Sequence, residues 1–567
     1  MSRSFRRVLT FAIGFVTVVA AGPALASVQA SNEQKGLSAI NHIVVIYEEN
    51  HSFDNLYGGW EGVNGLAAAD AAHTTQVIQS NTSPPPAYTC LMQNDVNLVS
   101  APGPLCTDST TGTTFTSHFT NQPFNIEAYI PAGARTCPQP GVFAPNGLPP
   151  SDGNLPGGCT RDIVHRFYQE QYQLNNGNQN RYVTGSDAVG LAMGYYNTTA
   201  LPIYAYLHSD GHPHYAIADD FFQSAFGGSF LNHQWLIAAA SPTWADAPDT
   251  QRSILDGNSM PTNYPLYHTD ATKQDKAITQ RCTVPATNPR ACGDYAVNTI
   301  QPFQQPFRGS PQLPAQTGIT IGDKLTTAGV SWAWYSGGWS NANGDVGAPG
   351  WTNGLAPTAD GKCSDPDSQL NLVWPYCPNK VFQYHHQPFN YYAAYAKDTP
   401  GRTHLRDEAE FINVANNSTK TCNLNSVSFV KPIGLENEHP GYTSEGRGSD
   451  HLVQLLSAID NSACRKDTMV VVTYDEFGGQ WDHVAPPGQG NANGPHDWWG
   501  PGTRIPALVI APRLRGNFVV DHTQYDTTSI LATIEHRYGL TRLRSDSRDG
   551  AVNDLSSVFN AHSPFET

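Results

Sequence analysis

After its first 26 residues, the sequence has no apolar run long enough to cross a bilayer. Three arginines within the first seven residues precede the uncharged apolar stretch 8–21, and the small residues of a cleavage site follow at Ala24 and Ala26. This pattern predicts a secretory signal peptide over residues 1–26. A membrane anchor is the alternative, but the run is short for a membrane span. We therefore expect a soluble protein that is secreted or periplasmic and has no stable membrane anchor.

The sequence also has no C-x-x-C pair, although it contains ten cysteines. Zinc clusters usually use that spacing, so its absence argues against one. An even number of cysteines in an exported protein favours disulfides instead. The cysteines that lie near one another in the sequence suggest the pairs Cys90–Cys106, Cys137–Cys159, Cys282–Cys292, Cys363–Cys377 and Cys422–Cys464. The sequence alone does not fix this pairing.

Positive charge is scarce, since 32 Lys and Arg residues stand against 48 Asp and Glu residues and give a net charge of −16. This balance argues against a nucleic-acid partner, which usually meets a basic face. The chain also lacks internal repeats and a clear linker. We therefore expect one domain over residues 27–567, with loop-rich insertions at about 80–160 and 240–380 where Pro and Gly are frequent.

Two short apolar runs end in side chains that carry oxygen ligands. Residues 43–47 lead to Glu49 and Asn50, and a second run far along the chain leads directly into Asp475 and Glu476. Ligands in open α/β sheets bind beyond the carboxyl ends of the strands. Two such ends suggest one shared site for a hard divalent cation. The alternative is that these are ordinary loop or helix-cap residues.

Strands alternate with helices along the chain, which indicates an α/β fold with a mostly parallel central sheet flanked by helices. Periodicity and breakers predict helices over residues 161–172, 201–220, 319–327, 448–460 and 526–538, and strands over 43–47, 330–335, 470–474 and 505–511.

Ser229 follows Gly227 and Gly228 at a turn that opens a helical apolar run. A helix N-terminus presents free N–H groups to an anion, so a metal-activated Ser229 would be a suitable nucleophile there. An ordinary N-cap serine is the alternative. The segment is not a G-x-S-x-G elbow, which weakens the case for a serine esterase.

Four histidines are candidates for donating to a phosphoryl oxygen or protonating a leaving group. They are His165 on a predicted helix, the adjacent His385 and His386, and His439 before a proline. Because the chain has 20 histidines, any one of them taken singly is more often a packing or surface residue.

Taken together, these segments resemble the bacterial phosphoesterase family of acid phosphatases and phospholipases C. The family's opening motif Glu-Asn-x-Ser-Phe-Asp stands at 49–54, and its closing motif Thr-Tyr-Asp-Glu-x-Gly-Gly-x-x-Asp-His-Val stands at 473–484. The middle segment 227–233, Gly-Gly-Ser-Phe-Leu-Asn-His, resembles the acid phosphatase branch. Phe477 stands where phospholipase relatives often have Asn. The resemblance covers most of residues 40–540.

The resemblance implies an alkaline-phosphatase-like fold with one bound divalent metal ion of unknown identity. The implied metal ligands are Glu49, Asn50, Asp475, Glu476 and Ser229, and Ser229 is also the implied nucleophile. The implied residues around the phosphate are His165, His385, His386 and His439 as catalytic groups, and Asn232 as a substrate-binding group.

The expected function is therefore that of a secreted, metal-dependent acid phosphatase that hydrolyses phosphate monoesters through a phosphoserine intermediate. Its partners would be small phosphate esters. The nearest alternative is a phospholipase C that cleaves phosphocholine lipids. An exported binding module with a structural metal and a serine carboxylesterase are alternatives from other classes.

Overall fold

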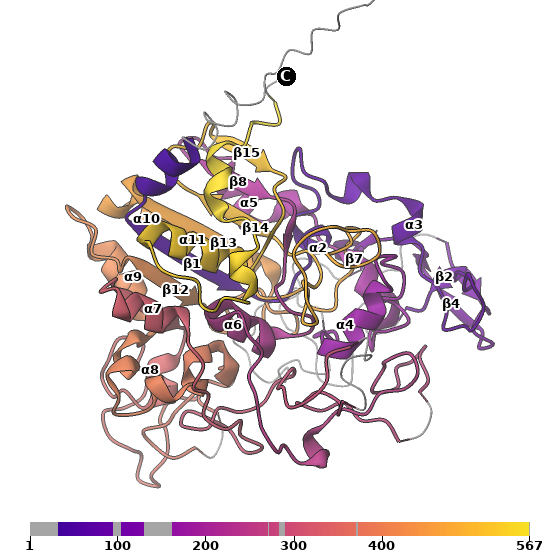
Figure 1. The fold of residues 1–567 in the computed structure, drawn as a ribbon, viewed down its shortest axis with the longest axis horizontal. Coiled ribbons are helices and arrows are strands. Elements are labelled where there is room, and N and C mark those ends of the chain that lie inside the picture. Colours follow the sequence, from indigo (N-terminus) through magenta and orange to yellow (C-terminus); the bar gives the residue numbers. More distant parts are fainter. Residues whose placement is uncertain are drawn as a thin grey trace, which may run out of the picture.

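The computed structural model describes residues 32–93, 104–129, 161–269, 272–282, 290–369 and 372–565. Its centre is an eight-stranded sheet in the order β11-β10-β12-β1-β13-β14-β8-β15 (Figure 1). The strands are β1 (His42–Glu48), β8 (Tyr215–Ala218), β10 (Trp332–Ser336), β11 (Leu405–Asp407), β12 (Val427–Lys431), β13 (Thr468–Tyr474), β14 (Ala507–Ile510) and β15 (Phe518–Asp521). Within this sheet only β14 runs antiparallel to its neighbours. The predicted α/β fold with a mostly parallel sheet is confirmed.

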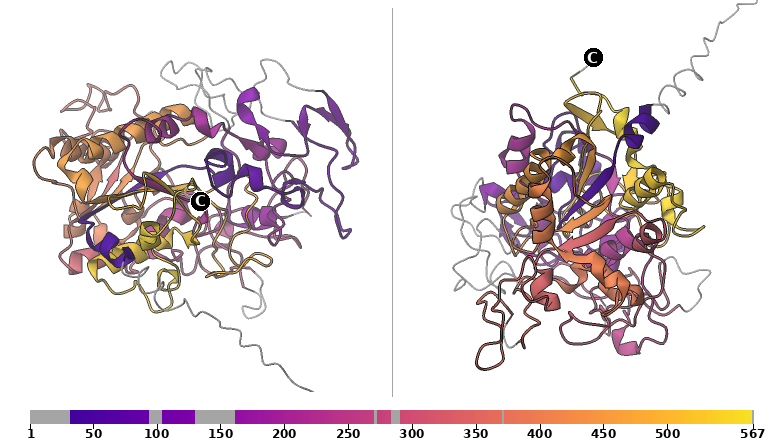
Figure 2. Two further views of the ribbon diagram at one scale, coloured as in Figure 1. Left: turned by 90° about the horizontal axis from the view of Figure 1, so that it is seen from above. Right: turned by 90° about the vertical axis from the view of Figure 1, so that its left-hand side faces the viewer.

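Helices cover both faces of the sheet (Figure 2). One face carries α5 (Pro202–Leu207), α9 (Glu408–Asn417) and α10 (Glu445–Asp460), and the other carries α6 (Ser229–Ala238), α7 (Ile321–Thr327) and α11 (Thr528–Tyr538). With both faces covered, the central strands have no polar side to expose. β13 is accordingly buried along its whole length, as is β1 beyond its first residue.

The remaining elements are short and lie outside the main sheet. The helices are α2 (Phe53–Leu56), α3 (Ala71–Thr74), α4 (Phe167–Leu174) and α8 (Trp339–Asn343). The paired strands are β2 (Cys90–Leu91) with β5 (Phe119–Thr120), β3 (Cys106–Asp108) with β4 (Phe115–Ser117), β6 (Phe124–Asn125) with β7 (Gly194–Tyr195), and β9 (Phe221–Phe222) with β16 (Tyr525–Asp526). β2 and β4 project to one side of the sheet in Figure 1.

Four of the five predicted disulfides are confirmed. They are Cys90–Cys106, Cys282–Cys292, Cys363–Cys377 and Cys422–Cys464. The predicted Cys137–Cys159 pair and the predicted signal peptide over residues 1–26 lie outside the described residues. Among the described helices, none combines the length and apolar character that a membrane span requires. The single-domain boundaries stay a prediction.

Two helix predictions need correction. The helix expected over residues 201–220 ends at Leu207, and Tyr215–Ala218 forms strand β8 of the central sheet. Gly211 and Pro213 lie between the two elements and favour a turn over a continuous helix. The helix expected from residue 161 begins only at Phe167, because the backbone before it is extended and contacts the turn that precedes Ser229.

The register of the sheet brings two segments that are far apart in the sequence side by side. β1 lies between β12 and β13 and is parallel to both, with Tyr47 opposite Thr473. The carboxyl ends of β1 and β13 therefore lie side by side, and the residues that follow them enter the same rim. This pairing joins motifs that are more than 400 residues apart in the sequence.

A buried ion network fixes the loops that follow these strands. Arg504 is fully buried, and its guanidinium lies 3.1 Å from both the Asp54 and the Asp482 carboxylates. It also donates to the carbonyl oxygens of Asn64 and Asp219. Asp54 follows β1 and Asp482 follows β13, so one cation holds both loops against the sheet.

We predict that Arg504→Met lowers the free energy of unfolding by about 3–5 kcal/mol, because it removes the buried cation that pairs with both Asp54 and Asp482 and leaves only His483 beside Asp54. Urea denaturation would measure the change. Arg281→Met is a matched control, since Arg281 is 62% exposed in its ion pair with Asp249 and its loss should cost at most about 1 kcal/mol. Equal effects of the two substitutions would contradict the prediction.

Candidate active site

The first part of the site is the turn after β1. Glu49 and Asn50 are buried, and Asn50 has a φ of 62°, in the left-handed region that L residues rarely adopt. Gly478 approaches this turn so closely that a Cβ atom there would lie 2.2 Å from the Asn50 carbonyl oxygen. The backbone N–H of Asn50 donates to Asp475 Oδ1 at 3.3 Å. The two strand-end motifs are therefore locked to each other.

Ser229 is the first residue of α6, and two glycines place it there. An added Cβ would lie 2.6 Å from the backbone nitrogen of Phe167 at Gly227, and 2.7 Å from the carbonyl oxygen of His165 at Gly228. Only glycine permits this approach of the two segments. As a result, the N-terminus of α6 and the backbone of His165 lie against each other.

The Ser229 hydroxyl lies among the predicted metal ligands. Its Oγ is 3.2 Å from Glu49 Oε2, 3.5 Å from Asn50 Oδ1 and 3.4 Å from Glu476 Oε1. Asp475 lies next to these ligands, because its Oδ1 accepts a hydrogen bond from the backbone N–H of Asn50. The structure thus brings together all five residues that the resemblance implies as metal ligands.

Burial sets the electrostatics of the three carboxylates, none of which is exposed. Burial and the charge of Glu49 raise the pKa of Asp475 well above its usual range, and burial and Asp475 do the same to the pKa of Glu476. Burial also acts to raise the pKa of Glu49, but His386 and Lys431 outweigh it and leave that pKa well below its usual range. Glu49 is thus the carboxylate that the fold holds ionised.

Lys431 is a site residue that the sequence analysis missed. It ends β12, is fully buried, and its Nζ lies 2.5 Å from Glu49 Oε1. It also donates to the carbonyl oxygens of Tyr47 and Glu48 at 2.8 and 3.1 Å. The available signal was a lysine at the end of a buried strand run, which is the same position that drew attention to Glu49.

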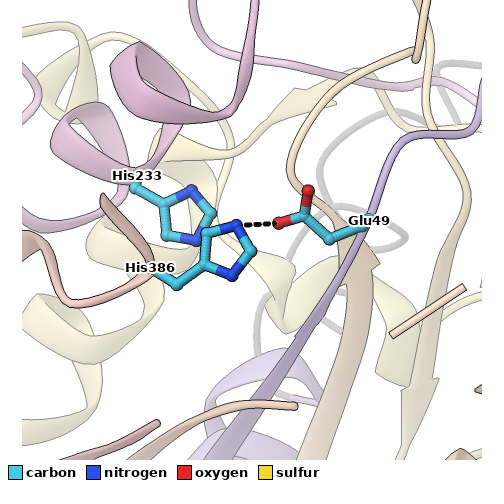
Figure 3. A group of neighbouring side chains, drawn as sticks. All are labelled: Glu49, His233 and His386. Atoms are coloured by element: carbon cyan, nitrogen blue, oxygen red, sulfur yellow. Dashed lines mark ion pairs between the residues drawn. The ribbon is translucent and has the colours of Figure 1, made fainter. Parts of the chain in front are cut away.

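A stacked pair of imidazoles approaches the same carboxylate. His386 Nε2 lies 3.0 Å from Glu49 Oε1, and the rings of His386 and His233 stack with centroids 5.0 Å apart (Figure 3). His233 donates from Nδ1 to the Ser229 carbonyl oxygen at 2.8 Å. Lys431 and His386 thus occupy one oxygen of Glu49, while the other oxygen faces Ser229.

His165 and His439 line the opposite side of the site. Their Nδ1 atoms lie 2.5 and 2.7 Å from the carbonyl oxygens of Ile163 and Pro440. A carbonyl only accepts, so Nδ1 is the donor in both rings, and Nε2 faces Asn50 Nδ2 at 3.4 and 3.1 Å. Burial is the main cause that lowers the pKa of each ring.

Two predicted residues lie further from the hydroxyl. The side-chain amide of Asn232 contacts the backbone of Ala225, Gly227 and Gly228, so it supports the turn before α6. His385 contacts His386 and His233 ring to ring, with centroids 4.7 and 6.1 Å apart. The substrate-binding role of Asn232 and the catalytic role of His385 stay predictions.

A cavity of about 280 Å³ opens beside the Ser229 hydroxyl. His165, Asp162 and Asp187 line it together with Ser229 and Phe230. Its entrance is therefore polar, and its volume is near the lower limit of about 300 Å³ for small-molecule pockets.

The site fits a divalent metal ion. Three buried carboxylates face one buried ammonium, and Asp475 Oδ2 has no hydrogen-bond partner among the described residues. Buried charge that is left uncompensated is costly, and one divalent cation would balance the formal charges. Carboxylate, amide and hydroxyl oxygens suit a hard cation. Glu49, His233 and His386 also offer ligand atoms within 4.8 Å of one another, on the other side of Glu49.

A comparison with known families matches the phosphoesterase family over residues 40–541. The chain therefore belongs to the phosphoesterase family and is a hydrolase that acts on phosphoric ester bonds. This confirms the resemblance that the motifs around residues 49–54, 227–233 and 473–484 suggested. The α/β sheet with its site at the strand ends agrees with the alkaline-phosphatase-like class expected for this family.

Several curated proteins are similar over most of the chain. Phospholipase C A of Mycobacterium tuberculosis is 24% identical and aligns over 93% of this chain and 78% of its own length. Phospholipase C B of the same species is 24% identical over 96% of this chain and 82% of its own length. Among solved structures, a 2-O GAG sulfatase aligns over 66% of this chain and 72% of its own length, with 10% identity and a TM-score of 0.28. A similarity this low says nothing about the function of this chain.

We predict that Lys431→Met lowers the free energy of unfolding by about 3–5 kcal/mol in the presence of a chelator, because Glu49 loses its buried counter-charge. Divalent cation should restore much of the loss, since it supplies positive charge to the same carboxylate. Thermal denaturation with and without metal would measure both effects. Lys420→Met, at an exposed position, is the control and should change neither value. A loss that metal leaves unchanged would contradict the predicted link to Glu49.

Proposed function

We propose that this protein is a secreted, metal-dependent acid phosphatase that hydrolyses phosphate monoesters through a phosphoserine intermediate. One observation carries the proposal: the Ser229 hydroxyl lies within 3.5 Å of oxygens from Glu49, Asn50 and Glu476 at the N-terminus of α6. A nucleophile, a cation-binding donor set and free backbone N–H groups therefore meet at one point.

A bound divalent ion would lower the pKa of the Ser229 hydroxyl and neutralise charge on the phosphoryl group. Ser229 Oγ then attacks phosphorus, and the bond from phosphorus to the ester oxygen breaks. The first N–H groups of α6 face the equatorial oxygens and stabilise their charge. Water later cleaves the phosphoserine and releases inorganic phosphate. The protein's main contribution is to position groups and stabilise charge.

His439 is the best-placed acid for the leaving oxygen. Its Nε2 lies 3.8 Å from Glu49 Oε2 and 3.1 Å from the Asn50 amide nitrogen. Glu49 and Asn50 both contact the Ser229 hydroxyl, so His439 lies next to the proposed nucleophile. With Nδ1 committed to the Pro440 carbonyl, only a protonated ring has a proton on Nε2 to donate. His165 has the same arrangement and would bind a phosphate oxygen from the other side.

Phospholipase C activity is the alternative, and the names of the M. tuberculosis relatives support it. The cavity beside Ser229 holds about 280 Å³, which suits a small ester group. Phe477 is fully buried and offers no polar contact to a headgroup. These two features are why we place phosphate monoesters before phospholipids.

Secretion is part of the proposal. Four disulfides lie in the described residues, and such bonds persist in oxidising compartments outside the cytoplasm. The basic, apolar and small-residue pattern of residues 1–26 supports the same location.

We predict that Ser229→Ala reduces kcat for p-nitrophenyl phosphate by at least about 10³-fold, because the covalent step loses its nucleophile. A chelator should abolish the activity of the wild type, and added divalent metal should restore it. Ser209→Ala, at an exposed serine, is the control and should keep full activity. Activity that survives both Ser229→Ala and the chelator would contradict the mechanism.

The pH profile of kcat/KM tests His439 as the acid. Burial lowers its pKa, so the protonated form appears only below the ordinary value of about 6.5. A step that needs this form is fast at acidic pH, and kcat/KM should fall as pH rises through the lowered pKa. His439→Gln should flatten this descending limb while keeping its fold. A profile that rises steadily above pH 8 would exclude this role.

A substrate panel separates the two activities. We expect a higher kcat/KM for small aryl phosphates than for phosphatidylcholine presented in mixed micelles, because the space beside Ser229 is small. Measuring inorganic phosphate and phosphocholine release in parallel identifies which bond is cleaved. Preferential release of phosphocholine would support the phospholipase alternative.

A further inference from the structure

A second cavity, here called the basal pocket, lies at the end of the sheet opposite the Ser229 site. β8 and β13 begin beside it and β14 ends beside it; the catalytic residues follow the other ends of β1 and β13. The cavity has a volume of about 470 Å³, within the range of about 300–1,000 Å³ that small-molecule pockets occupy. It is lined by residues 211–214, 459, 460, 465, 466, 468, 470 and 510–513 together with Leu456.

The walls and the rim of the basal pocket differ in chemistry. Leu456, Ile459, Ile510 and Ala511 supply apolar walls and are themselves buried in the core. The rim carries three exposed cationic side chains, from Arg465, Lys466 and Arg513, with His212 and His214 beside them. Asp460 is the one carboxylate among the lining residues.

The three rim cations have no ion-pair partner among the described residues, where no carboxylate lies within ion-pair distance of Arg465, Lys466 or Arg513. Three such cations around one apolar opening create a local positive potential that attracts an anion.

The backbone that carries these side chains has two features of its own. Arg465 and Lys466 follow Cys464 directly, and the Cys422–Cys464 disulfide ties that short helical turn to a neighbouring loop. Arg513 has a φ of 72°, a left-handed conformation that glycine would adopt without cost. An arginine there keeps a side chain at the rim despite the backbone strain, and such strain points to a use for the side chain.

We propose that the basal pocket binds an amphipathic anion, whose alkyl chain lies against the apolar walls and whose carboxylate or phosphate head contacts Arg465, Lys466 and Arg513. A purely polar anion would leave the apolar walls uncovered, and an uncharged or cationic amphiphile would gain nothing from the rim. The site is separate from the catalytic centre, so this inference does not depend on the proposed phosphatase activity.

Isothermal titration with dodecanoate and with dodecyl phosphate, below their micellar concentrations, tests the proposal; the full-length protein carries Ser229→Ala in every arm, so that dodecyl phosphate is not hydrolysed during the measurement. Both should bind, and the head that binds more tightly identifies the source of the anion. Shortening the chain should weaken binding by about fourfold per CH₂ removed, as expected for buried apolar surface. The triple variant R465Q/K466Q/R513Q should weaken binding at least tenfold, and rising salt should weaken it too, because the rim is exposed.

Arg515→Gln is the matched control, since Arg515 is an exposed arginine near the same turn that contacts His562 and Asn560 instead of the pocket. It should bind dodecanoate as the protein with the native rim does. Dodecyltrimethylammonium and dodecyl maltoside should not bind at the concentrations used. The proposal is overturned if dodecanoate fails to bind the protein with the native rim, if the triple variant binds it equally well, or if the cationic amphiphile binds as tightly.

Discussion

The structure depends on holding three carboxylates in a buried cluster around one hydroxyl. Glu49, Asp475 and Glu476 have no exposed surface, and ionising all three so close together is unfavourable unless positive charge compensates them. The buried ammonium of Lys431 supplies part of the compensation, and the donor set fits a divalent ion that would supply the rest. The glycines, the left-handed Asn50 and the Arg504 network are local features that keep this cluster in place.

The parallel sheet is what makes such a cluster possible. Adjacent parallel strands end on the same edge, so β12, β1 and β13 deliver Lys431, Glu49 and Asp475 to one rim. The reactive serine comes from a helix on one face of the sheet, and its distance from Glu49 is set by the Gly227-Gly228 turn. The opposite edge of the sheet carries no catalytic residue among those named here, and the basal pocket lies there with three cations on its rim.

Burial also decides the acid–base character of the histidines. In a free peptide, His165 and His439 would be partly protonated near neutral pH. In the fold, burial lowers both pKa values, and a backbone carbonyl accepts from each Nδ1. Each ring is therefore neutral at neutral pH and faces the site with an unprotonated Nε2. Acidic conditions would turn the same rings into donors, which links the predicted pH dependence to position in the fold.

The sequence by itself determined the strands that lead to Glu49 and Asp475 and the glycine turn before Ser229, because local patterns and motif order encode them. It suggested the four disulfides through cysteines that are near in the sequence, but only the structure fixed their pairing. It did not reveal Lys431 or His233, since a lysine at the end of a buried strand run is only a weak signal and one histidine among many gives none. The sequence pattern also predicted a helix over residues that form β8, because pairing of this strand with β14 and β15 outweighs the local preference for a helix. Which oxygens meet, how deeply they are buried and which cations stay unpaired follow from strand order and packing, and these only the tertiary structure decides.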